Sequence, residues 1–219
     1  KYGQPTQFTI TGNLLDNEIT VSVQNCKGLT LVAGGTSTSK SVSCTISSVG
    51  AGAVSLEAES VDGSILKFVS FDVPNPQVSM LTNLGTMVIE LNPTAAPLST
   101  DNYLQYVNSK FYDNTLIHRI VTAGIFVAQG GWLTPAPAVQ LGQKAAIALE
   151  VNKGLSNLKG TIAMARSSEL NSSTFDNKKL MRLLLLFGTT TSTTTGTTSI
   201  DIDELAGPIT ELAILAEAP

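Results

Sequence analysis

Charged residues, histidine and cysteine are all scarce in this sequence, and each scarcity excludes a class of function. Charged side chains make up 14% of the 219 residues, against roughly 25% in an average soluble domain. The net charge is −4, and neither half of the chain carries a cluster of Lys or Arg. Nucleic acid is therefore not an expected partner, because contacts to a phosphate backbone require positive charge.

Long apolar runs are also missing. No stretch reaches about 18 apolar residues, so we expect no transmembrane segment. The sequence starts at Lys1 without a basic and apolar leader. This start is compatible with a cytosolic protein, or with an exported protein whose signal peptide has been removed.

The two cysteines, Cys26 and Cys44, both lie in the first third of the chain. Strict alternation over Val42–Ile46 places Cys44 on the apolar face of a strand. Two buried free thiols are one interpretation, since cysteine is often a core residue. A disulfide that staples a small sandwich fits the pattern better, and it implies an oxidising compartment. Two cysteines and one distant histidine, His118, are too few for a zinc site.

Short alternating segments separated by turn residues fill the chain from Gln7 to Val73. Apolar residues alternate with Ser, Thr or Glu in three segments, around Phe8–Ile10, Ile19–Val23 and Val54–Ala58. Turn residues occur at 11–13, 15–17, 34–35, 50–52 and 62–63. No helical period appears in this part of the chain. Six or seven short strands in about 70 residues predict an immunoglobulin-like β-sandwich over residues 1–75.

A proline-containing connector, Pro74-Asn75-Pro76-Gln77, predicts a boundary between two domains. The second domain is expected to span residues 76–219. It should begin with a hairpin whose strands lie around Val78–Met80 and over Thr86–Leu91, joined by a turn. Polar residues at Ser99–Asn102 predict the start of a helix, whose apolar stripe is Leu104, Val107 and Phe111.

A series of motifs then follows in order along the second domain. They are Asn83–Leu91, Ala95–Pro97, Asn102–Leu104, Phe111–Asp113, Ile117–Ile120, Phe126–Gly131, Glu150–Asn157 and Lys159–Arg166. From Val78 to about Ser168 the sequence resembles the cyclophilins, a family of peptidyl-prolyl cis/trans isomerases. The resemblance implies a cyclophilin-like closed antiparallel β-barrel capped by helices. The whole protein is therefore expected to be mainly β.

The chemistry of such an enzyme is simple to state. Resonance raises the barrier to rotation about a peptide bond to about 18–20 kcal/mol, and Xaa-Pro bonds exchange only over tens of seconds or longer. A catalyst needs no nucleophile, proton transfer, metal or cofactor. It needs an apolar slot for the proline ring and donors that bind the twisted amide better than either planar isomer.

The resemblance also implies a role for individual residues. It places Arg119 as the catalytic residue, whose guanidinium reaches toward the prolyl nitrogen and carbonyl. His118 is interpreted as structural, because the reaction moves no proton. The expected substrate-binding residues, which line the proline pocket and the peptide groove, are Phe126, Val127, Gln129, Met164, Ala165, Arg166 and Phe175.

Several features depart from the family pattern. Val127 stands where many members carry Met, and Thr122-Ala123-Gly124 lengthens the interval between Arg119 and Gln129. The Ser-Gln-Phe-Phe strand expected after residues 171–174 is represented by Phe175 alone, and one residue cannot supply a strand of about five. We therefore expect strand residues to be missing between Thr174 and Lys179. Leucines at 183–186 and a Thr-rich stretch at 189–198 are also atypical.

The predicted function is acceleration of Xaa-Pro isomerisation in folding or exported proteins, in the periplasm or another exported location. The expected partners are proline-containing peptides, unfolded proteins and cyclosporin-like ligands. Two alternatives remain open. One is a non-catalytic module that binds proline peptides, which the Val127 substitution and the missing strand favour. The other is an adhesion protein in which the sandwich dominates.

Overall fold

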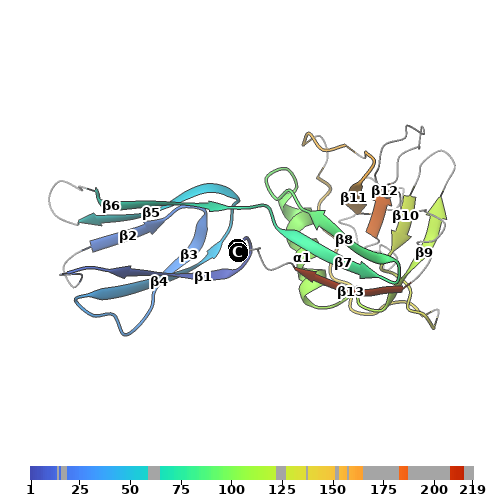
Figure 1. The fold of residues 1–219 in the computed structure, drawn as a ribbon, viewed down its shortest axis with the longest axis horizontal. Helices are drawn as coiled ribbons and strands as arrows, with labels where there is room; N and C mark the ends of the chain where they lie inside the picture. The colour runs from blue at the N-terminus through green and yellow to red at the C-terminus, as the bar shows by residue number, and fades with distance from the viewer. Residues whose placement is uncertain are drawn as a thin grey trace. The chain divides into compact units, whose positions relative to one another are not determined.

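The computed structural model divides into two compact units, Lys1–Pro76 and Gln77–Pro219. It describes residues 1–13, 15, 19–58, 65–121, 127–136, 138–150, 153–156, 158–164, 183–186 and 208–214. Within these ranges the protein is mainly β, with thirteen strands and one helix (Figure 1). None of the helical residues described forms a segment long and apolar enough to cross a membrane.

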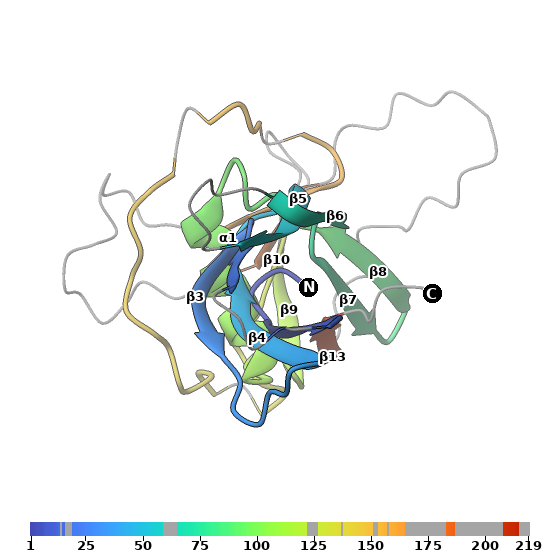
Figure 2. The same ribbon diagram turned by 90° about the vertical axis from the view of Figure 1, so that its left-hand side faces the viewer.

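The described residues of the first unit form six strands, in agreement with the number predicted. They are β1 Pro5–Thr11, β2 Ile19–Val23, β3 Cys26–Leu31, β4 Ser39–Ile46, β5 Gly50–Ala58 and β6 Ile65–Val73. They form two antiparallel sheets, ordered β1-β4-β3 and β2-β5-β6. Figure 2 shows β5 and β6 on one side of this unit and β3 and β4 on the other. The turn predicted over 50–52 is wrong, because these residues already belong to β5.

Alternation along β4 supplies much of the core of this unit. Val42, Cys44 and Ile46 are 4%, 4% and 2% exposed, as their spacing predicts. Phe8 of β1 and Phe71 of β6 connect the two sheets, with ring centroids 5.7 Å apart. Gly52 lies opposite Phe71, and a Cβ there would lie 2.8 Å from the Phe71 ring, so a larger residue would force the ring to shift.

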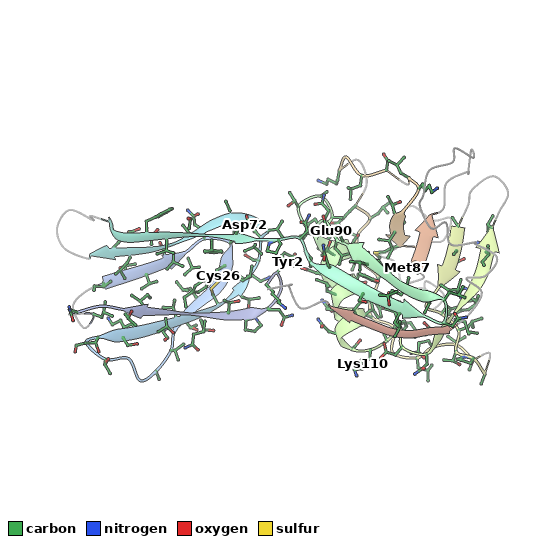
Figure 3. The ribbon with its side chains drawn as sticks, viewed as in Figure 1. Tyr2, Cys26, Asp72, Met87, Glu90 and Lys110 are labelled. Carbon is green, nitrogen blue, oxygen red and sulfur yellow. A yellow bond between two sulfur atoms is a disulfide. The ribbon has the colours of Figure 1, made fainter. Side chains whose placement is uncertain are left out.

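The predicted disulfide between Cys26 and Cys44 is present, with Cα atoms 5.8 Å apart (Figure 3). It joins β3 to β4, which are neighbours in one sheet, since Cys26 pairs with Ile46. The disulfide of antibody domains instead connects the two sheets of the sandwich. The bond in this protein therefore cross-links adjacent strands and does not tie the two layers together.

One seven-stranded antiparallel sheet dominates the second unit, in the order β11-β12-β10-β9-β13-β7-β8. The predicted hairpin is confirmed, since β7 and β8 pair on either side of Asn83-Leu84. Within the described ranges, β8 and β11 are the two ends of this sheet. The strands are β7 Gln77–Thr82, β8 Gly85–Glu90, β9 Thr115–Val121, β10 Val127–Gly130, β11 Thr161–Met164, β12 Leu183–Leu186 and β13 Pro208–Ile214.

The helix of this unit, α1 Pro97–Asn108, begins before the predicted Ser99–Asn102 start. Its N-cap residue, Ala96, makes no capping bond through a side chain. Instead, the carboxylate of Glu150 accepts hydrogen bonds from the backbone N–H groups of Leu98, at 3.0 Å, and Ser99, at 2.8 Å. The cap therefore comes from a residue more than fifty positions downstream, which local sequence cannot indicate.

The apolar stripe predicted for this helix is buried. Leu104 and Val107 are 6% and 3% exposed. Phe111 is 6% exposed as well, but it lies after the end of the helix. Its ring packs at 4.7 Å from that of Tyr106, edge to face, so an aromatic cluster closes this end of the helix against the following loop.

Candidate functional site

The pairing of β9 with β10 brings together the central residues of the predicted site. Arg119 lies opposite Gln129 in the register. Directly opposed residues of antiparallel strands project from the same face, and so does Val127, two residues before Gln129. The guanidinium Nη1 of Arg119 donates a hydrogen bond to Oε1 of Gln129, with a donor–acceptor distance of 3.3 Å.

Burial differs sharply between these side chains. Val127 and Gln129 are 1% and 2% exposed, whereas Arg119 is exposed. A guanidinium carries five N–H donors, more than the contact with Gln129 uses. The arrangement therefore offers a cation with donors at the protein surface, beside a buried amide and a buried aliphatic side chain.

Only part of the remaining predicted set can be placed relative to this face. Gln129 pairs with Leu184 of β12, and Leu184 pairs with Ala163 of β11. Ala163 therefore shares the face of Arg119 and Gln129. Met164 is the next residue along β11, so alternation directs it to the opposite face. That Met164 binds the substrate stays a prediction.

Four of the predicted substrate-binding residues, Phe126, Ala165, Arg166 and Phe175, lie outside the described residues. The interval between Thr174 and Lys179, where strand residues were expected to be missing, lies outside them too. The structure places a strand between β10 and β11 further along the chain, at Leu183–Leu186. The atypical leucine run therefore forms part of the central sheet.

Trp132, which was not among the predicted site residues, packs against His118, the residue before Arg119. The Trp132 ring meets the ring of His118 edge to face, with centroids 5.6 Å apart and planes at 70°. Nδ1 of His118 lies 3.4 Å from the carbonyl oxygen of Leu116. These contacts agree with a structural interpretation of His118. A signal for Trp132 was available, since the only tryptophan of the chain directly follows Gly130-Gly131.

The other titratable cluster of this unit consists of tyrosines. Burial raises the pKa of Tyr112 well above its ordinary value of about 10, and nearby Tyr103 and Tyr106 raise it further. Burial likewise raises the pKa of Tyr103. For Tyr106 burial outweighs the opposing effect of the Lys144 backbone N–H, which donates to its phenol oxygen at 2.6 Å. These phenols stay neutral and serve packing, and they are not candidates for acid–base work.

The part of the chain that the structure describes contains no cluster of side chains suited to binding a metal ion. No group of three or more His, Cys, Asp or Glu side chains gathers there in a way that could hold an ion.

Comparison with known proteins connects this geometry to a family. Residues 77–177 match the family described as cyclophilin type peptidyl-prolyl cis-trans isomerase/CLD. A peptidyl-prolyl cis-trans isomerase of Acinetobacter baylyi is 40% identical over 100 residues, which is 46% of this chain and 52% of that protein. Peptidyl-prolyl cis-trans isomerase A of Dickeya dadantii is 38% identical over 97 residues, covering 44% and 50% of the two chains. Peptidyl-prolyl cis-trans isomerase B of Escherichia coli is 39% identical over 97 residues, covering 44% and 57%.

The chain thus spans about half the length of the curated relatives that it matches. The matched residues lie in the second compact unit and include both strands that carry Arg119, Val127 and Gln129. Residues 77–177 are therefore similar to the cyclophilin-type peptidyl-prolyl cis-trans isomerases over the part of the chain that holds the candidate site.

Proposed function

We propose that the second unit is a peptidyl-prolyl cis/trans isomerase that acts on Xaa-Pro bonds in extended peptides and unfolded proteins. The observation that carries this proposal is the pairing of exposed Arg119 with buried Gln129 on one face of β9 and β10. The family match of residues 77–177, which covers this strand pair, supports it.

The arrangement suits the reaction because isomerisation requires stabilisation of a twisted amide. As the C–N bond rotates, the prolyl nitrogen becomes pyramidal and regains its lone pair, which can then accept a hydrogen bond. Arg119 is always charged and has donors available for that nitrogen and for the adjacent carbonyl. Gln129 orients the guanidinium through its Oε1 atom. A donor that is stronger for the twisted amide than for either planar form lowers the barrier.

The test is an isomerisation assay on a peptide with one Xaa-Pro bond, followed by exchange NMR so that no auxiliary protease is needed. We expect wild-type protein to accelerate exchange, and Arg119→Ala to lower kcat/KM by about 10²-fold, the usual effect of removing one transition-state donor. Lys153→Ala removes an exposed cation elsewhere in the same unit and should change nothing. Folded wild-type protein without any acceleration would contradict the proposal.

The non-catalytic alternative has one observation in its favour. Val127 is 1% exposed, so it does not present a surface to solvent in this structure. If the unit only binds proline peptides, the same peptide should show saturable binding with no change in its exchange rate. Binding by the first unit alone would instead support an adhesion function.

Two features of the fold are also proposed: the class of the first unit and the closure of the second sheet. We propose that the first unit is immunoglobulin-like, on the support of two packed three-stranded sheets, although its disulfide lies within one sheet. We also propose that the second sheet completes a closed barrel, as in the family that residues 77–177 match, and that helices cap it.

An exported location, such as the periplasm, is proposed from the disulfide, because such bonds persist in oxidising compartments. Unfolded exported proteins would then be the natural clients, in a chaperone-like role. Cyclosporin-like cyclic peptides are proposed to compete for the face of Arg119. Competition with the Xaa-Pro peptide in the exchange assay tests this last point.

A further inference from the structure

We infer that Trp132 is a positioning residue for Arg119: its ring holds His118 at an irregularity in β9 and thereby sets the direction of the guanidinium. This inference rests on the proposed isomerase function and adds a residue outside the set that contacts the peptide. It follows from the strand register, from the aromatic contact and from the long hydrogen bond between Arg119 and Gln129.

The first observation is a β-bulge next to Arg119. Arg119 pairs with Gln129, but Gly130 pairs with Ile117 and the register shifts between these two positions. His118 is therefore the extra residue of β9, located at this register shift. Bulges bend the strand, increase its twist and re-aim neighbouring side chains. The direction of Arg119, which follows immediately, depends on how this bulge is held.

The second observation is that Trp132, in the segment after β10, packs against the bulge residue. Its ring packs edge to face on His118, with centroids 5.6 Å apart. Hydrogen bonds also hold the backbone of Trp132 and Leu133. The carbonyl of Trp132 accepts from Gln140 N–H at 2.8 Å, and the carbonyl of Leu133 accepts from Leu116 N–H at 2.7 Å. The segment that carries the indole is thus hydrogen-bonded to β9, and the indole packs against the residue at the register shift.

The third observation is that the hydrogen bond between Arg119 and Gln129 is long. It measures 3.3 Å, longer than the roughly 2.7–3.2 Å that is usual for N–H···O bonds. The Arg119 side chain is exposed and long, so rotamer freedom competes with that contact. The backbone at His118 therefore has to supply much of the preorganisation that a transition-state donor needs.

Trp132→Leu tests the inference, with Trp132→Phe as the matched control that keeps an aromatic ring against His118. Each is made in wild type and in Arg119→Ala, and kcat and KM are measured with the peptide of the exchange assay. We expect Trp132→Leu to lower kcat about tenfold with little change in KM, and Trp132→Phe to stay within about twofold. In the Arg119→Ala background, Trp132→Leu should have no further effect.

The double-mutant comparison separates positioning from ordinary packing. A loss that is equally large with and without Arg119 would show that Trp132 acts on the whole fold, and would overturn the inference. An unchanged kcat in Trp132→Leu would overturn it too while leaving the isomerase function intact. Wild-type protein without activity would overturn the function and the inference together.

A second variant guards against loss of the fold. His118→Leu removes the same aromatic contact from the β9 side, and should reproduce the kcat loss of Trp132→Leu. Trp132 is the only tryptophan in the chain, so its fluorescence reports this contact directly. A shifted emission in His118→Leu at an unchanged melting temperature is expected. Identical emission in the variant and wild type would contradict the contact itself.

Discussion

Removing the disulfide of the first unit should destabilise that unit alone. Cys26 and Cys44 are separated by 18 positions in sequence. Closing a loop of this size stabilises a fold by about 3 kcal/mol in the chain-entropy model, because the cross-link restricts the unfolded chain. Cys26→Ala combined with Cys44→Ala should lose this amount and, in addition, some packing at Cys44, which is 4% exposed.

Reduced wild-type protein is the matched control, because it keeps both side chains and loses only the cross-link. Hydrogen exchange followed by mass spectrometry can report β3 and β4 separately from the rest of the full-length protein. A loss of about 3 kcal/mol corresponds to amide exchange about 10²-fold faster in the first unit. Because unfolding of two units is not a single transition, a probe of the second unit is needed in parallel.

Trp132 supplies that probe, since its fluorescence arises only from the second unit. Its unfolding midpoint in urea should be the same in oxidised, reduced and double-alanine protein. If reduction changes exchange in β3 and β4 less than about threefold, the loop-closure argument is wrong for this sheet. The hairpin geometry would then hold the loop closed without the covalent bond.

Two further predictions concern the second unit. Glu150→Gln should lower the free energy of unfolding of this unit by about 1–2 kcal/mol, because it weakens the charged cap on the N–H groups of Leu98 and Ser99. Urea unfolding followed by Trp132 fluorescence measures this loss. An unchanged midpoint would mean that solvent caps α1 equally well. Alkaline pH should also destabilise it. Tyr103 and Tyr112 have raised pKa values in the folded protein, whereas the same phenols ionise near pH 10 in the unfolded chain. Their contribution to the free energy of unfolding is therefore fully present below about pH 10 and is lost as the pH rises above it. The absorbance of the Tyr103 and Tyr112 tyrosinates should therefore rise together with unfolding, and their ionisation near pH 10 in folded protein would contradict the burial.

Features set by local pattern could be predicted from the sequence. Alternation alone places Val42, Cys44 and Ile46 on one buried face of β4. The β7–β8 hairpin follows from two alternating segments around a short turn. Val127 and Gln129 are two residues apart in one strand, so a common face could also be predicted for them.

Features set by pairing between distant segments could not be predicted. The start of α1 depends on Glu150, which reaches the helix only after the chain has folded back. Ala163 comes onto the face of Arg119 only through its register with β12, a strand that lies further along the chain. Trp132 gains its importance from a bulge at His118, and a bulge is a property of two strands together.

The measurement that tests the central claim most directly is the exchange rate of a single Xaa-Pro bond in the presence of wild-type and Arg119→Ala protein. The account predicts acceleration by wild type, a loss of about 10²-fold in kcat/KM in the variant, and equal melting temperatures for the two. If folded wild type and Arg119→Ala accelerate exchange equally, Arg119 is not the catalytic donor. If neither accelerates exchange, the second unit is not an isomerase.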